Sequence, residues 1–280
     1  MSIDVLDGIV PTVLLCLLFL LPAYLKSLQA PHPQALPSDK LYYPSSPSDV
    51  FEVRRFLVKF LPPELVNTII DDAGYWPRIS CSSAERRAVI ASYYPRYNAA
   101  LRYLVTPAFP SSEELGGRGA RLRVKQVNFK IRSNDQGWTS DLMHQGTYSG
   151  SYTWFEATIL RPEQAPELLG WRRVTVALGF HGRRPSGPLL EVKNPAEPDG
   201  HWRVQTNRCA SSVPVDHDIV WQDGASADLQ EAGEENGSGD GAGFIETLAP
   251  GDRIGIIARA MYLGWVNLVR SVEVVVYYAV

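Results

Sequence analysis

Two short stretches of the chain combine aromatic rings with groups that bind hydroxyls. "NDQGW" carries Asn134, Asp135 and Trp138, and "YLGWVN" carries Trp265 and Asn267. A tryptophan ring covers the apolar C–H groups of a sugar, while an amide or carboxylate beside it bonds the hydroxyls. Both stretches lie at the ends of expected strands, where the loops of a β-sandwich gather. We therefore predict a ligand-binding site here, with core packing of the two tryptophans as the alternative.

The five histidines show no recognisable metal site. No two of them have the spacing of an H-E-x-x-H or H-x-H ligand set. Asp141 and His144, in "DLMHQG", fall in an expected loop, and we add them to the predicted ligand-binding residues. In "VDHD" His217 stands between Asp216 and Asp218, but neighbouring residues of a strand point to opposite faces, so the three should not converge. The sequence predicts no metal ion and no cofactor.

Patterns for catalysis are also missing from the sequence. The chain has no G-x-S-x-G nucleophile elbow, and Cys209 in "NRCAS" has no histidine partner that a pattern identifies. "GGRGAR" lacks the Lys-Ser/Thr that begins a phosphate-binding helix. A pair of acids for glycoside hydrolysis is defined by geometry in space and is not readable from one sequence. These observations favour a binding protein over an enzyme.

The composition describes a globular chain of one or two domains that must position these residues. Of the 280 residues, 45% are hydrophobic and 20% are charged, which permits an ordinary folded core. The net charge of −3 argues against a general nucleic-acid-binding protein, so no nucleic-acid partner is expected. The three cysteines, Cys16, Cys81 and Cys209, lack the spacing of a disulfide framework or a zinc site.

The N-terminal stretch "IVPTVLLCLLFLLPAYL", Ile9 to Leu25, carries no charge. Crossing a bilayer as a helix takes about 20 apolar residues, so the stretch qualifies. A secretory signal peptide needs a basic leader, whereas this leader holds two acids and no base. We predict a transmembrane anchor over residues 1–29, with a signal peptide or a buried or interfacial helix as alternatives. Lys26 and Lys40 follow the stretch, which predicts a single-pass membrane protein with its body in the cytosol.

Pro and Ser are frequent in residues 30–48, which we interpret as an extended tether. Helical patterns follow, and we assign residues 49–115 to a helical segment. "VFEVRRFLVKFL", residues 50–61, repeats apolar residues at helical spacing, and a second helix runs from position 64 to about 75. A third and weaker helical pattern covers residues 84–104.

From Leu122 onward the apolar residues alternate as they do in strands. "VKQVNFKIR" places Val127, Phe129 and Ile131 on one side and polar residues on the other. Six further strand-like stretches follow, separated by clusters of Gly, Pro, Asn and Asp. Seven or more short strands indicate a mainly β fold, an antiparallel and jelly-roll-like β-sandwich over residues 120–280.

Residues 223–243 contain six acids, no base and many glycines. Such a composition buries too little apolar surface to offset the entropy lost on ordering, so we predict a mobile, disordered acidic loop. The loop holds the sequon "NGS" at Asn236, which would be glycosylated only if the body of the protein were lumenal. The basic run at 118–132 is interpreted as a solvated strand face, with an anionic partner as the alternative.

The stretch "FLPPELVNTIIDDAGYWPR", residues 60–78, begins as an F-box begins. An F-box continues as a compact helical unit, whereas "GYWPRISCSS" introduces a proline and a Ser/Cys turn after the first helix. We therefore predict a short helical hairpin that packs on the β-domain or on itself. An F-box-like unit is the alternative.

The same helix, with three longer stretches of the β-region, resembles a widespread group of filamentous-fungal proteins. The three stretches are "SNDQGWTSDLMHQGTYSGSYTWFEATILRP", "HWRVQTNRCA" and "LAPGDRIGIIARAMYLGWVNLVRSVEVVVYYAV". The resemblance covers most of residues 50–280 and supports the domain limits, but it implies no activity. A looser likeness of architecture connects the expected sandwich with F-box-associated β-sandwiches and galactose-binding jelly rolls.

These features predict a membrane-anchored, non-catalytic binding module of a filamentous fungus. It would meet the membrane through Ile9 to Leu25 and bind a protein or a polar ligand through its sandwich loops. The first alternative is an F-box-like ubiquitin-ligase adaptor, in which the helical hairpin recruits a ligase subunit. The second is an accessory enzyme of a fungal biosynthetic pathway.

Overall fold

The computed structural model describes residues 44, 46–93, 97–115, 122–163, 173–174, 188–194, 196, 200–224 and 235–280. The predicted anchor and almost all of the tether lie outside these residues, in a unit that ends at Tyr43. No helix of the described residues is long and apolar enough to cross a membrane. The described residues of the unit that begins at Pro44 form three helices and two β-sheets.

The helices α2 (Pro47–Leu57) and α3 (Pro63–Asp72) form the predicted hairpin. Pro63 occupies the first turn of α3, where the N–H that proline lacks has no helical partner to bond. The two helices bury a small apolar cluster that the C-terminal Val280 also contacts (Val50, Val66, Ile70). Lys125 of the β-region forms an ion pair of 3.1 Å with Asp71. The hairpin therefore packs both on itself and on the β-domain.

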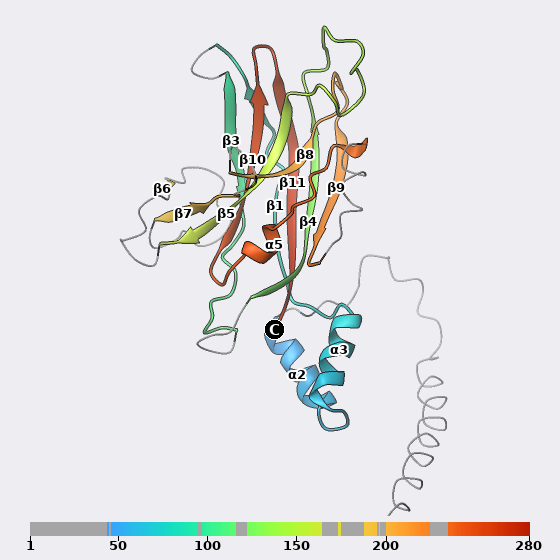
Figure 1. The fold of residues 1–280 in the computed structure, drawn as a ribbon, viewed down its shortest axis with the longest axis vertical. Coiled ribbons are helices and arrows are strands. Elements are labelled where there is room, and N and C mark those ends of the chain that lie inside the picture. The colour runs from blue at the N-terminus through green and yellow to red at the C-terminus, as the bar shows by residue number, and fades with distance from the viewer. Residues whose placement is uncertain are drawn as a thin grey trace, which may run out of the picture. The chain divides into compact units, whose positions relative to one another are not determined.

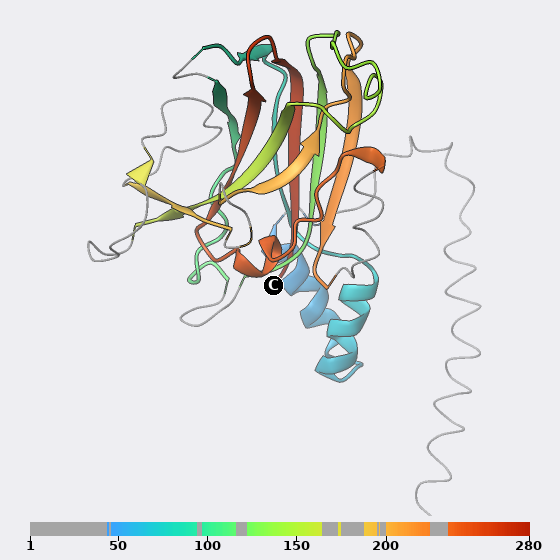
Figure 2. The ribbon, with the colours of Figure 1, turned by 45° about the horizontal axis from the view of Figure 1, so that its top comes forward.

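Two antiparallel sheets pack against each other and confirm the predicted β-sandwich (Figures 1 and 2). Sheet A has the order β1 (Arg78–Ser83), β11 (Val266–Ala279), β4 (Arg123–Asn134) and β9 (Val215–Gln222), and β2 (Arg87–Ile90) also pairs with β11. Sheet B has the order β3 (Asn98–Val105), β10 (Arg253–Met261), β5 (Thr153–Pro162), β7 (Leu189–Val192) and β6 (Arg173–Val174), and β8 (Trp202–Thr206) also pairs with β5. A short helix, α5 (Phe244–Thr247), precedes β10.

The core lies between the two sheets and follows the predicted alternation. Val127, Phe129 and Ile131 of β4 point inward and are at most 1% exposed. Each fully buried aliphatic or aromatic side chain of this kind stabilises the fold by roughly 1.5–3 kcal/mol. Sheet B contributes alternate residues of β5 and β10 to the same core (Phe155, Ala157, Ile159, Ile254, Ile256, Ala258).

The prediction of helix over residues 84–104, and of a helical segment reaching 115, is wrong. Described residues of this region form β1, β2 and β3, so the sheets begin at Arg78 and not at 120. β1 pairs with β11, which joins Arg78 to Tyr277, and β3 pairs with β10. These partners are far away in the sequence, and pairing with them overrides a weak local helical pattern.

The prediction of a mobile loop over residues 223–243 is wrong for residues 235–243. Residues 225–234 lie outside the described part, but 235–243 are packed against β8 and β9. The backbone N–H of Gly239 donates to Val204 at 3.0 Å, and the indole of Trp221 donates to the carbonyl of Gly239 at 2.8 Å. A Cβ atom at Gly241 would overlap the Trp221 ring. Some of the glycines that suggested mobility are therefore needed for close packing.

Candidate functional site

Three of the predicted ligand-binding residues, Asn134, Asp135 and Asn267, are buried at the loop end of the sandwich. The carboxylate of Asp135 accepts hydrogen bonds from the backbone N–H groups of Gly137 at 2.8 Å and Ala210 at 2.6 Å. It thereby joins two loops that are far apart in the sequence. Burial raises the pKa of Asp135, although these backbone bonds oppose the shift. Asp135 positions loops and does not present its carboxylate to solvent.

Asn267 takes part in a polar network between the two sheets. Its amide donates to two backbone carbonyls, of β5 and β10, at 3.0 and 3.1 Å. Its side-chain oxygen accepts a bond of 3.0 Å from Asn207, which also donates to Thr153 and accepts from Ser133. Since this side chain is fully buried and its donors and acceptor are bonded, it holds the strand ends together. Sequence reasoning missed Asn207, because nothing local distinguishes it.

The two predicted tryptophans lie on the outside of the same end. Trp138 is 61% exposed and lies over Gly264, where an added Cβ would be 3.5 Å from its ring. Trp265 is half-buried, and its ring centroid is 5.2 Å from that of Tyr152. Tyr152 also contacts Tyr262 at 4.7 Å. We call Trp138, Tyr152, Tyr262 and Trp265 the loop-end aromatic cluster.

Tyr262 was missed by sequence reasoning, and its backbone is unusual. Its φ of 68° lies in the left-handed region, which is costly for a residue with a side chain. Its N–H donates to the carbonyl of Tyr97 at 2.7 Å, which holds the turn in place. The strain keeps an aromatic ring, 46% exposed, beside the other members of the loop-end aromatic cluster. Strain of this kind concentrates at functional sites.

Asp141 and His144 form a pair within one loop. The His144 Nδ1 atom lies 2.6 Å from the Asp141 carboxylate, and both side chains are well exposed. The hydrogen bond from His144 lowers the pKa of Asp141. The carbonyl of His144 also accepts a bond of 2.8 Å from the Thr147 hydroxyl. These contacts order the loop that follows Trp138, and they do not join the pair to the loop-end aromatic cluster.

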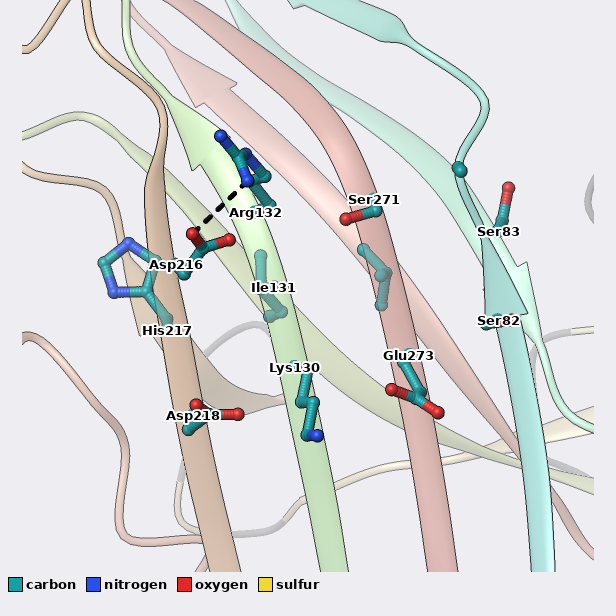
Figure 3. Close-up of a pocket in the computed structure, with 12 residues that line it drawn as sticks. Ser82, Ser83, Lys130, Ile131, Arg132, Asp216, His217, Asp218, Ser271 and Glu273 are labelled. Carbon is teal, nitrogen blue, oxygen red and sulfur yellow. Dashed lines mark ion pairs between the residues drawn. The ribbon is translucent and has the colours of Figure 1, made fainter. Parts of the chain in front are cut away.

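A groove on the outer face of sheet A was not predicted (Figure 3). It has a volume of about 420 Å³ and crosses strands β1, β11, β4 and β9. Its side chains stand in two rows across the strands. One row is Glu273, Lys130 and Asp218, and the other is Ser271, Arg132 and Asp216. We call these six residues the sheet A groove.

The alternation of β9 separates His217 from the two acids beside it. Asp216 and Asp218 are exposed in the sheet A groove, whereas His217 is 7% exposed and contacts the ring of Tyr148 at 5.9 Å. Figure 3 shows the imidazole on the other side of β9 from the Asp216 carboxylate. Burial lowers the pKa of His217. The three residues therefore do not converge, as the sequence pattern predicts.

Sheet B carries a cluster of buried charges on its outer face. His201 lies between Glu156 and Glu191, with Nδ1 at 2.8 Å from one carboxylate and Nε2 at 3.3 Å from the other. Burial alone would lower the pKa of His201, but the two carboxylates raise it to about 9. Hydrogen bonds and cations outweigh the burial of Glu191 and bring its pKa to about 2.

These pKa values decide what the sheet B cluster can do. A general acid or base is most effective when its pKa lies near the working pH. At neutral pH His201 is already a cation and Glu191 is already an anion, so neither is poised to exchange a proton. We interpret the cluster as an ion network that fastens β5, β7 and the residues before β8.

Metal and thiol chemistry find little support in the described residues. No group of three or more His, Cys, Asp or Glu side chains in this part of the chain could hold a metal ion. Cys81 and Cys209 are buried free thiols. Burial raises the pKa of both, to about 11 for Cys81, so neither is a reactive thiolate at neutral pH.

Comparison with known proteins gives no assignment. No protein-family model matches the chain, and no curated protein is significantly similar to it.

Proposed function

We propose that this protein is a non-catalytic binding module that holds a protein or a polar ligand through the loops at one end of its β-sandwich. The observation that carries the proposal is the loop-end aromatic cluster. Exposed Trp and Tyr supply large contact areas at a low entropic cost, which makes them frequent anchors of binding surfaces. The cluster also includes Tyr262, whose backbone is held in the left-handed region.

The polar residues beneath the cluster support the proposal in a different way from the one the sequence suggested. Asp135 and Asn267 fix the loops from below, so the aromatic rings sit on a preorganised base. A rigid base lowers the entropy lost on binding. In this proposal the ligand touches the aromatic rings, and the exposed pair of Asp141 and His144 stands apart from them in the loop that follows Trp138.

The proposal keeps the N-terminal anchor and the jelly-roll-like arrangement. The anchor is supported by the uncharged stretch Ile9–Leu25 and by the lysines that follow it, and these features favour a body in the cytosol. The jelly-roll-like arrangement is supported by the way the chain passes between sheets. β4 belongs to sheet A and β5 to sheet B, and β10 of sheet B is followed by β11 of sheet A.

A photoreactive amino acid at position 142 tests the proposal in cells. Leu142 is 76% exposed in the loop that follows Trp138. We expect a covalent adduct from this position that disappears in the Trp138→Ala variant. The same photoreactive residue in place of Val220, on the outer face of sheet A, is the control. No adduct at 142, or one that persists after Trp138→Ala, would refute the proposal.

The F-box-like adaptor is kept as a second candidate because the helical hairpin exposes apolar side chains. Phe56 of α2 and Phe60 in the turn after it have ring centroids 5.4 Å apart, and Leu65 and Ile69 lie four residues apart on α3, with exposures between 44% and 71%. Residues four apart share one side of a helix. The other flank of the hairpin, with Arg54, lines a cavity against the β-domain. The apolar side is therefore free to take a partner helix.

Co-purification distinguishes the adaptor from the binding module. An adaptor must retain a ubiquitin-ligase subunit, and the double substitution Phe56→Ser with Phe60→Ser should release it. Val58→Ser is the matched control, because Val58 is 41% exposed but takes no part in the contact between the Phe56 and Phe60 rings. If no ligase subunit co-purifies with the unaltered chain, the adaptor function is excluded.

A further inference from the structure

The sheet A groove displays charges that are not used inside the protein. Register places Lys130 directly opposite Glu273 on one side and Asp218 on the other. None of these three side chains forms an ion pair with another described residue. The pair of Arg132 and Asp216, at 3.4 Å, is more than half exposed on both sides and is weak in water. The charges are therefore available to a ligand.

The order of charges across the strands indicates what that ligand must be. The first row reads negative, positive, negative, and the second row reads hydroxyl, positive, negative (Figure 3). Three carboxylates would repel an anionic ligand, and Lys130 and Arg132 would repel a cationic one. A neutral ligand rich in hydroxyls avoids both repulsions, because each hydroxyl donates to a carboxylate and accepts from an ammonium or guanidinium group.

The groove is also rigid and of a suitable size. Its side chains rise from four hydrogen-bonded strands, and the residues between them, Ile131 and Val272, are anchored in the core. Strands lie about 4.8 Å apart, so Glu273 and Asp218, two strands from each other, present acceptors about 10 Å apart on either side of Lys130. Pockets that hold small ligands run from about 300 to 1,000 Å³, and the groove falls within that range at about 420 Å³.

We propose that the sheet A groove is a binding site for a neutral saccharide, separate from the loop-end aromatic cluster. Hydroxyls of the sugar bond Glu273, Lys130 and Asp218 in one row and Arg132 in the other. No Phe, Tyr or Trp lines the groove among the described residues, so the binding is polar and modest. This inference does not depend on the function proposed for the loops.

Saturation-transfer NMR on the full chain tests the inference with four neutral trisaccharides, namely maltotriose, cellotriose, laminaritriose and triacetylchitotriose. At least one should bind with a dissociation constant near or below about 1 mM. Lys130→Met and Asp218→Asn, which lie on different strands, should each weaken binding about tenfold or more. The matched controls are Lys59→Met on the hairpin and Glu246→Gln on α5, both exposed and outside the groove, and they should leave binding unchanged.

Three outcomes would overturn the inference. One is the failure of all four trisaccharides to bind at about 10 mM. Another is binding that survives both groove substitutions. If Trp138→Ala abolishes that surviving binding, the sugar binds at the loop-end aromatic cluster. That result would support the proposed function and refute the saccharide site in the sheet A groove. The third is binding of a peptide of alternating Glu and Lys with no trisaccharide bound, which would make the groove a peptide site.

Discussion

The Nδ1 atom of His201 lies 2.8 Å from a carboxylate oxygen of Glu156, and both side chains are withdrawn from solvent. A buried histidine normally loses its proton, because burial disfavours the charged form. Here Glu156, together with Glu191, keeps the imidazole protonated and raises its pKa to about 9. The pair therefore couples the stability of sheet B to pH.

That coupling predicts how stability changes with pH. The pKa of His201 rises from 6.5 in the unfolded chain to about 9 in the folded one, so its contribution is complete below pH 6.5 and is lost as pH rises through about 9. The pKa of Glu191 falls from 4.5 to about 2, so its contribution is complete above pH 4.5 and is lost as pH falls through about 2. Thermal unfolding measured between pH 5 and 10 should show that the free energy of unfolding declines from about pH 6.5 upward, by roughly 1–3 kcal/mol in all.

The His201→Gln variant provides the check on this decline. It should be less stable than the unaltered protein at pH 6 and should show a much flatter profile between pH 6.5 and 9. His144→Gln is the control, because the His144 ring is exposed and pairs with the exposed Asp141. If His201→Gln keeps the full alkaline decline, the ion network described for sheet B is wrong.

Tryptophan substitutions should separate the surface rings from the core rings. Trp202 is 3% exposed and contacts Phe244 at a centroid distance of 5.0 Å, so Trp202→Ala should destabilise the protein by roughly 3–5 kcal/mol. Trp138 is 61% exposed, so Trp138→Ala should lower the free energy of unfolding by less than about 1 kcal/mol. Chemical denaturation measures both. Equal losses would mean that Trp138 is a packing residue and has no free face for a ligand.

Arg161 and Arg132 both pair with an aspartate, but burial makes their pairs unequal. Arg161 donates to both carboxylate oxygens of Asp252, at 2.8 and 2.7 Å, and Asp252 is fully buried. Arg161→Met leaves that carboxylate buried without its cation, which should cost about 3 kcal/mol. Arg132→Met breaks an exposed pair with Asp216 and should cost about 0–1 kcal/mol. Urea unfolding of the two variants compares them, and a similar small loss in both would show that Asp252 gains little from Arg161.

Gly241 offers a test of the packed end of the acidic segment. Gly241→Ala adds a methyl group that overlaps the ring of Trp221, and it also strains a residue whose φ is 65°. Gly243 has a similar φ of 72°, but its added Cβ meets nothing within 4 Å. Gly243→Ala should therefore lower the free energy of unfolding by only about 1 kcal/mol, through backbone strain. Gly241→Ala should lower it clearly more, because the added methyl group also overlaps a ring. Equal melting temperatures for the two variants would indicate that residues 235–243 are mobile after all.

The sequence by itself determined the mainly β architecture and the helical hairpin. Alternating apolar residues, such as Val127, Phe129 and Ile131, define one face of a strand whatever its partner is. The pair Pro62-Pro63 likewise fixes the start of α3 locally. The same alternation is enough to place His217 on the opposite face of its strand from Asp216 and Asp218.

Only the tertiary structure decided which residues meet. β2 and β3 fall within the weak helical pattern and yet are strands, because pairing with β11 and β10, far away in the chain, outweighs local preference. Asn134, Asp135, Trp138 and Asn267 are close together in the fold, yet the first two and the last are buried and only the tryptophan faces outward. The residue type gave no sign of this, because an Asn or Asp that ties loops together and one that binds a ligand have the same chemistry. The sheet A groove depends on strand register, which long-range pairing sets and which no local pattern reports.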